Sequence, residues 1–166
     1  MDYGDILSPV QRYTYAFFLT GTTEKNNEVI FYRNDATVGW SAVITDTPVG
    51  EGGNGGLCPS QNLVDMYDMA NGSAPFNSYD ATGAPLYNST ANGVAVPTVN
   101  TASGYDDTTP VSNRDPRLAA TILYNGVTWG QATTTKTNVI DVTAGGRDNP
   151  VGNANATPTG YYVRKY

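Results

Sequence analysis

The chain has 166 residues, which suits one domain with a modest hydrophobic core. Its formal net charge is −6 and its isoelectric point is near 4.3, so long-range electrostatics oppose nucleic acid and anionic membranes as partners. It contains no histidine and a single cysteine, Cys58, which excludes Ser-His-Asp and Cys-His catalysis and an internal disulfide. We expect no cofactor and no metal site. We also expect the chain to be soluble as given, because no apolar stretch approaches membrane-spanning length.

The first predicted helix covers about 9–20. Ser8 can cap this helix, Pro9 suits its first position, and Gln11 completes a capping box. Apolar side chains recur at helical spacing after this start, which is typical of a face packed on a core. A short apolar run at about 28–33, bounded by asparagines, then predicts a buried strand.

A glycine-rich segment follows at about 50–56. Its residues Gly50, Gly52 and Gly55 match the fingerprint of a dinucleotide-binding loop. However, Glu51 would meet the pyrophosphate and Pro59 interrupts the passage into a helix, so we reject this function. The segment is interpreted as a flexible loop.

The second predicted helix covers about 60–70. Ser60 is its expected cap and Gly72 its expected terminator. Asp65 and Asp68 lie three positions apart, so both face one side of the helix. A pair of carboxylates can bind a cation, but no second acidic cluster lies nearby in sequence, and we interpret this side as solvated.

Regular periodicity disappears between about 73 and 112, where prolines and glycines punctuate small polar residues. An excursion of this length is either functional or disordered. Its aromatic residues argue against disorder, because disordered linkers are poor in such rings. These residues are Phe76, Tyr79, Tyr87 and Tyr105. We therefore predict an irregular loop of which part packs.

A bend, a strand and a turn are predicted in succession at 113–126. The bend carries the charges of Arg114, Asp115 and Arg117 around Pro116. The apolar run that follows predicts a strand at about 117–124, closed by the turn signal Asn125-Gly126. We expect a bidentate arginine–aspartate ion pair to pin the bend to the core. A site for an anion or a sugar hydroxyl is the alternative for this cluster.

Two further strands are predicted at about 138–142 and 160–165, separated by a turn at 145–150. The expected fold class is α+β and loop-rich, with a few short helices and short strands. We expect the whole of 1–166 to form a single domain or fragment.

Several of these motifs occur in the order found in one known family. They are the helix at 59–72, the segments 113–118 and 121–126 with Trp129, Gly145-Gly146 with Asp148, and 159–162 with Arg164-Lys165. The segment 27–31 is similar to the family's sequence before its long loop. Over about 27–166 the chain thus resembles the SusD/RagB family.

The resemblance implies a function in nutrient uptake. Members of this family are outer-membrane lipoproteins of Bacteroidetes that capture glycans or other nutrients at the cell surface and sit on a SusC-like TonB-dependent transporter. They are binding proteins and not enzymes, and they rest on a tetratricopeptide-like helical scaffold. Cys58 is internal and does not match the family's lipid anchor. We expect this chain to be similar to a central section of such a protein, lacking most of the scaffold helices.

Sugar binding would use rings that stack on apolar sugar faces and polar side chains that bind hydroxyls. The candidate platform consists of Trp40, Tyr79, Tyr105 and Trp129, and the candidate polar partners are Arg147, Asp148 and Asn149. Apolar flanks favour packing for both tryptophans, whereas both tyrosines lie in the long loop.

Two other functions are weighed against glycan binding. The chain could be a structural segment that docks the transporter without its own ligand site. It could also be a carbohydrate-active enzyme, for which Asp106-Asp107 is the most conspicuous carboxylate couple. Neighbours on an extended segment point to opposite faces, which does not fit the two-carboxylate geometry of glycosidases.

Overall fold

The computed structural model describes Tyr13, which is helical, and residues 45–129 and 138–164. The rest of the predicted first helix at 9–20, the predicted strand at 28–33 and Trp40 lie outside the described residues. The chain divides into two compact units, which are described separately. The central unit is Pro59–Ala119, and the terminal unit is Met1–Cys58 with Ala120–Tyr166.

The central unit begins with helix α3 (Gln61–Asp65), which is shorter than the predicted 60–70. Ser60 is extended and its hydroxyl accepts a hydrogen bond from the Leu63 N–H, so the predicted cap is confirmed. The helix ends at Asp65, before the predicted terminator Gly72. Met69, which falls within the predicted helix, forms an isolated β-bridge with Arg114 instead.

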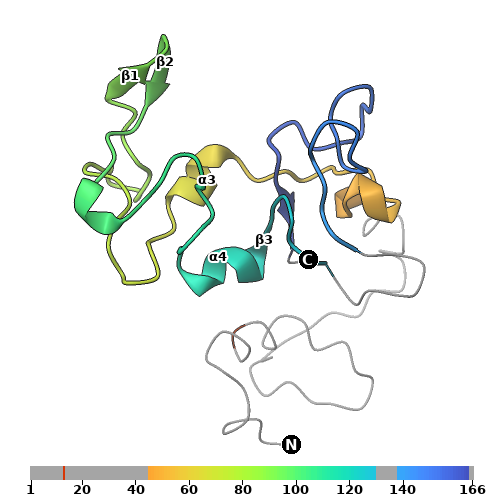
Figure 1. Ribbon diagram of the computed structural model, residues 1–166, viewed down its shortest axis with the longest axis horizontal. Helices are drawn as coiled ribbons and strands as arrows, with labels where there is room; N and C mark the ends of the chain where they lie inside the picture. The colour runs from red at the N-terminus through yellow and green to blue at the C-terminus, as the bar shows by residue number, and fades with distance from the viewer. Residues whose placement is uncertain (1–12, 14–44, 130–137, 165–166) are drawn as a thin grey trace, which may run out of the picture. The chain divides into compact units, whose positions relative to one another are not determined.

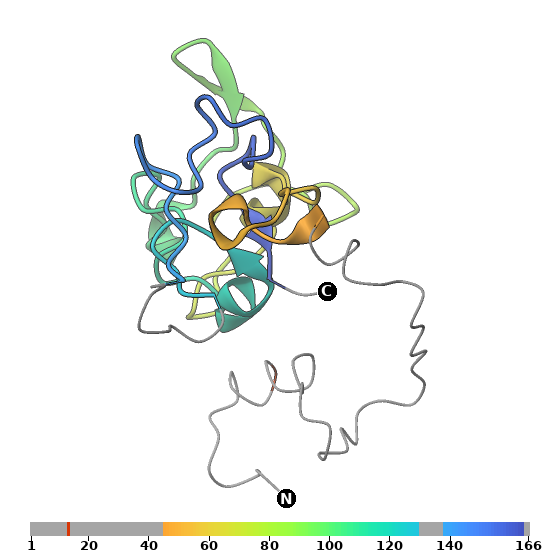
Figure 2. The ribbon, with the colours of Figure 1, turned by 90° about the vertical axis from the view of Figure 1, so that its right-hand side faces the viewer.

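The segment 73–112 is more ordered than an irregular loop. It contains the antiparallel hairpin β1 (Ser89–Ala91) and β2 (Val94–Val96), and the 3₁₀ helix η2 (Thr101–Ser103). The hairpin turns at Asn92 and Gly93, which have φ of 50° and 79°, the left-handed pair that favours a two-residue hairpin. Figures 1 and 2 show the hairpin extending away from the helices of its unit.

Phe76 is the centre of ring packing in the central unit. The Tyr105 ring meets it edge-on at 4.9 Å between centroids, and the Tyr79 ring lies at 6.5 Å. Phe76 also forms a β-bridge with Val99, and its side chain is buried. The expectation that part of this segment packs is confirmed.

Helix α4 (Pro116–Thr121) occupies the first part of the segment 117–124, for which a strand was predicted. The strand prediction was therefore wrong for 117–121. Only Ile122–Leu123 forms a strand, β3. The Asp115 carboxylate accepts the Arg117 N–H at 2.8 Å and caps the helix, while Pro116 suits its first turn. Two alanines, the strongest helix formers, then follow within the helix. The division between the two units falls within α4, after Ala119.

The core of the terminal unit is built on β3 and β4 (Tyr162–Val163), which pair antiparallel. Leu123, Ile140 and Tyr162 are fully buried in it. Partly buried residues pack against them, namely Cys58, Val127, Trp129 and Val142. The predicted strand at 138–142 contributes only an isolated bridge between Thr128 and Val139. The predicted strand at 160–165 is confirmed in shortened form as β4.

The predicted Asn125-Gly126 turn is confirmed, because Gly126 has a φ of 84° and the Val127 N–H donates to the Tyr124 carbonyl at 3.1 Å. The Gly126 N–H donates to the Ile140 carbonyl at 2.8 Å, which ties the turn to the next segment.

The glycine-rich segment is packed and not a freely flexible loop. It forms the 3₁₀ helix η1 (Val49–Glu51). A Cβ on Gly55 would lie 2.5 Å from the Asn155 carbonyl oxygen and 3.0 Å from the Tyr162 ring. These glycines allow the backbone to approach the core closely.

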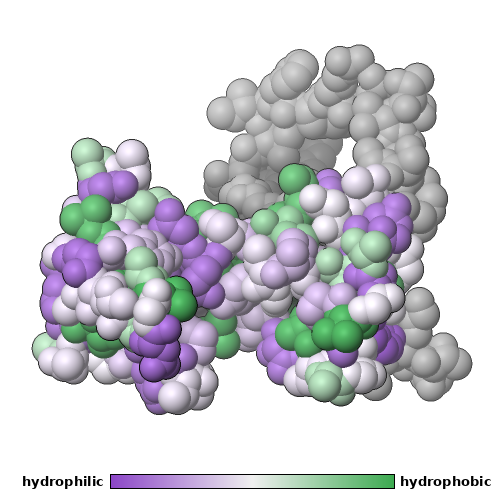
Figure 3. Space-filling view, turned by 90° about the horizontal axis from the view of Figure 1, so that it is seen from above, coloured by the Kyte–Doolittle hydropathy of each residue, from purple (hydrophilic) through white to green (hydrophobic). Residues whose placement is uncertain are grey.

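Within the described residues, no helix is long and apolar enough to cross a membrane. Polar and apolar side chains are interspersed on the face seen in Figure 3. The few short helices and the two two-stranded sheets confirm the α+β, loop-rich class.

Candidate functional site

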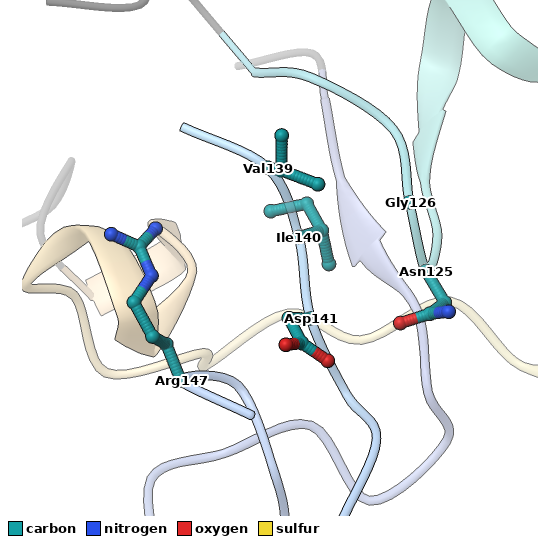
Figure 4. A pocket seen from close by; sticks show the side chains of 6 residues that line it. All are labelled: Asn125, Gly126, Val139, Ile140, Asp141 and Arg147. Atoms are coloured by element: carbon teal, nitrogen blue, oxygen red, sulfur yellow. The ribbon is translucent and has the colours of Figure 1, made fainter. Parts of the chain in front are cut away.

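A pocket of about 240 Å³ lies in the terminal unit, over the Asn125-Gly126 turn. Its lining residues come from this turn, from the segment that bonds to it, and from the following turn (Figure 4). They are Asn125, Gly126, Val139, Ile140, Asp141 and Arg147.

The Asn125 side chain is held through its amide oxygen Oδ1, which accepts the Val142 N–H at 3.1 Å. The Asn125 amide group therefore has its NH₂ to offer to a ligand. The backbone fixes the same edge of the pocket, because the Ile140 N–H donates to the Val127 carbonyl at 3.0 Å.

The Asp141 carboxylate lies between Asn125 and Arg147 in Figure 4. Its Oδ1 accepts the N–H and the hydroxyl of Thr143 at 3.1 and 2.5 Å. These bonds, followed by the nearby Arg147 charge, hold the pKa of Asp141 below its ordinary value. Asp141 is thus ionised at neutral pH and presents its second oxygen as an acceptor.

Asp148, the residue after the pocket-lining Arg147, is fully buried. One carboxylate oxygen accepts the Gly50 N–H at 2.9 Å, and the other accepts the Asp141 N–H at 3.0 Å. A Cβ on Gly50 would lie 2.8 Å from the Asp148 carboxylate, so glycine is needed for this approach. Asp148 fixes the position of Asp141 without lining the pocket itself.

Arg147 is exposed and forms an ion pair with Glu51, whose side chain is 5% exposed. The pair ties the pocket wall to η1. The neighbouring Asn149 is half-buried, and its side-chain oxygen accepts the Val151 N–H at 2.8 Å. Of the predicted polar partners, Arg147 lines the pocket, whereas Asp148 and Asn149 adjoin Arg147 in the chain.

The predicted aromatic platform falls into different parts of the chain. Tyr79 and Tyr105 belong to the central unit and pack around Phe76, where the Tyr79 hydroxyl accepts the Phe76 N–H at 3.1 Å. Trp129 belongs to the terminal unit and packs on its core.

The pocket residues Asn125 and Asp141 were not among the predicted site residues. The first was interpreted only as a turn former and the second as part of a strand. The Asp-x-Thr spacing of Asp141 and Thr143 is a sequence signal that could have indicated an exposed, ordered carboxylate.

A model of the SusD family matches residues 19–166. The chain belongs to the SusD family. The predicted resemblance is confirmed.

Among solved structures, this SusD-family chain is similar to a SusD-like protein from Bacteroides fragilis, with 21% sequence identity and a TM-score of 0.57. The match covers 95% of this chain and 28% of that protein's chain, so this chain spans less than a third of its length. At this identity the likeness shows the fold, which is part of a SusD-like fold. A search of the curated proteins found no match.

The central unit of this SusD-family chain contains a buried carboxylate. Asp65 is 3% exposed, which corrects its interpretation as part of a solvated helix face. Its two oxygens accept hydrogen bonds from the Gln61 amide at 2.7 Å and the Tyr87 hydroxyl at 3.1 Å. Burial raises the pKa of Asp65, and burial together with Asp65 raises the pKa of Tyr87 to about 12. No group of three or more potential metal ligands occurs in the described part of the chain.

Arg114, and not the predicted ion pair, ties the bend to the central unit. Its buried guanidinium donates to the carbonyls of Pro110 at 2.6 Å and Val64 at 2.8 Å, and it lies 5.3 Å from the centre of the Tyr105 ring. The ion pair that does form joins Asp115 to its near neighbour Arg117, whose side chain is 59% exposed. A pair two residues apart cannot pin a bend to a distant core, which is why the expectation was wrong.

Proposed function

We propose that this chain is part of a non-catalytic component of an outer-membrane uptake system that captures glycans or related nutrients at the cell surface. Membership of the SusD family over residues 19–166 carries this proposal. The loop-borne polar groups of the pocket support it, because hydroxyl recognition needs donors and acceptors held at fixed positions.

The chemistry of the pocket favours binding over hydrolysis. Glycosidases place two carboxyl groups on either side of the bond that they break. The pocket lining has one carboxylate, Asp141, alongside an amide and a guanidinium. Asp106 of the other candidate couple is engaged by the N–H and the hydroxyl of Thr108 at 2.8 and 2.7 Å.

The predicted aromatic residues remain candidates for additional ligand contacts. Tyr105 and Trp129 are half-buried, so each has an accessible part beyond its packing contacts. We propose that ligand contacts also involve Tyr79 and Trp40, together with the pocket residue Arg147 and its neighbours Asp148 and Asn149, of which the buried Asp148 acts through Asp141.

Binding is tested by isothermal titration of the full chain against a panel of oligosaccharides and peptides. We expect saturable binding of at least one glycan and no release of reducing sugar. A panel without a single binder would contradict the capture function, and sugar release above background would contradict its non-catalytic character.

A second role, docking on a SusC-like TonB-dependent transporter, is favoured by the β1–β2 hairpin. The hairpin is exposed along β1, and Val94 at its turn is 64% exposed. Exposed apolar side chains on a projecting element are typical of a contact surface. Co-purification with the transporter tests this role: Val94→Asp should reduce recovery of the complex, and unchanged recovery would argue against the hairpin as the contact.

A further inference from the structure

We propose that the pocket over the Asn125-Gly126 turn is a subsite for one uncharged sugar ring and that it rejects sugars carrying a carboxylate or a sulfate. This inference rests on the proposed capture function and names the substrate class that it would serve.

The size of the pocket limits the ligand. Pockets for drug-sized molecules enclose about 300–1,000 Å³, and this pocket encloses about 240 Å³, which is room for a single ring. Asn125, Gly126 and Arg147 are exposed at its edge, so the remainder of an oligosaccharide can continue into solvent.

The lining groups match a ring with neighbouring hydroxyls. The Asn125 NH₂ is a donor, and the free oxygen of Asp141 is an acceptor for a hydroxyl proton. Such a bond to an ionised acceptor is roughly twice as strong as a neutral one. The half-buried Val139 offers an apolar surface to the face of the ring.

The charges around the pocket decide against an acidic sugar. Asp141, Asp148 and Glu51 carry three formal negative charges, and Arg147 carries one positive charge, which gives −2 for the four side chains. The guanidinium is already paired with Glu51. A ligand anion would therefore meet a net negative charge, and like charges at short range are unfavourable where water is partly excluded.

The test compares a neutral oligosaccharide with its counterpart oxidised to a uronic acid at one ring, by isothermal titration of the full chain. Wild type should bind the neutral member more tightly. Asp141→Asn should lower the affinity for the neutral oligosaccharide about tenfold, because the charge-assisted bond is lost. It should also reduce the ratio of the affinities for the neutral and the oxidised oligosaccharide. Asn125→Asp keeps the acceptor for the Val142 N–H but removes the NH₂ donor and adds a negative charge, so it should lower the affinity for the neutral oligosaccharide and increase that ratio.

Asp106→Asn is the matched control. Asp106 forms the same Asp-x-Thr turn with Thr108, has a pKa lowered by the same kinds of bonds, belongs to the central unit and does not line the pocket. The change removes the same charge and leaves an oxygen to hold the turn, so both affinities should stay at the wild-type values. Circular dichroism and the melting temperature verify that each variant is folded.

The outcomes separate the two proposals. If wild type binds glycans but Asp141→Asn and Asn125→Asp match it, the pocket assignment is overturned and the capture function stands. Tighter binding of the uronic acid by wild type overturns the charge argument alone. If wild type binds no member of the panel, the capture function fails and the inference fails with it.

Discussion

The Tyr87 hydroxyl donates a hydrogen bond to the buried Asp65 carboxylate at 3.1 Å, across 22 positions of the chain. This bond joins the segment before β1 to helix α3 within the central unit. It also supports a carboxylate whose charge is costly to bury, since desolvation disfavours the ionised form.

Asp65 should make the central unit less stable as the pH rises from 3.8 through its raised native-state pKa. In that window the native state binds more protons than the unfolded state, so the free energy of unfolding falls with rising pH. Asp65→Asn removes this titration. Urea unfolding at a series of pH values should show the wild-type stability declining relative to the variant across the window and then running parallel to it.

Asp80→Asn should reveal the opposite pH dependence of the free energy of unfolding in the same experiment. Hydrogen bonds from Thr82 and Ala84 lower the pKa of Asp80, so its contribution is present above pH 3.8 and is lost as the pH falls through the lowered value. If both variants showed the same pH trend, the buried environment of Asp65 would be refuted.

Arg114→Lys should destabilise the chain by about 2–3 kcal/mol. A lysine ammonium is a point charge and cannot reproduce the fork of donors that reaches the carbonyls of Pro110 and Val64. Arg117→Ala is the control, because it removes an exposed ion pair of at most about 1 kcal/mol. Chemical denaturation measures both changes, and a larger loss for Arg117→Ala would reverse the assigned roles.

Asp148→Asn should cost about 1–3 kcal/mol in the free energy of unfolding. One of the two N–H groups that Asp148 accepts, from Gly50 and Asp141, would then face an amide NH₂ inside the protein. The neighbouring change Asn149→Ala removes an exposed bond and should cost less than about 1 kcal/mol. Thermal melting of the two variants checks this, and equal melting temperatures for Asp148→Asn and Asn149→Ala would exclude a structural role for Asp148.

Backbone amides of the β1–β2 hairpin should exchange with solvent much faster than those of the terminal-unit core. A two-stranded hairpin without a buried face is marginally stable, whereas Ile140 and Tyr162 are fully buried. Hydrogen exchange followed by mass spectrometry compares peptides spanning 89–96 with those spanning 138–142. Equal protection would indicate that the hairpin is covered in solution.

Local signals in the sequence predicted local structure well. Ser60 caps α3, and Asn125-Gly126 turns the chain, because both signals act through bonds to residues a few positions away. The order of several such motifs also led to the correct family and fold class. Helix α4 was missed, since a short apolar run fits a strand or a helix until the Asp115 cap is known.

The burial of Asp65 and the position of the pocket were not predictable in the same way. Asp65 is buried because Tyr87 and its segment fold over α3, and no pattern around Asp65 itself encodes that contact. The pocket depends on Gly50 meeting Asp148, two residues 98 positions apart. Spacing within a segment carries no information on such distant pairs.

Because Gly50 pairs with Asp148, the pocket cannot be isolated as one continuous piece of the chain. Every lining residue falls between 125 and 147, so a synthetic peptide covering 120–164 would contain the complete set. Such a peptide would still lack Gly50 and Glu51, the partners of Asp148 and Arg147. We expect it to be unstructured and unable to recognise sugar until a second peptide covering 45–58 is added, so that the two pieces reconstitute the site only together.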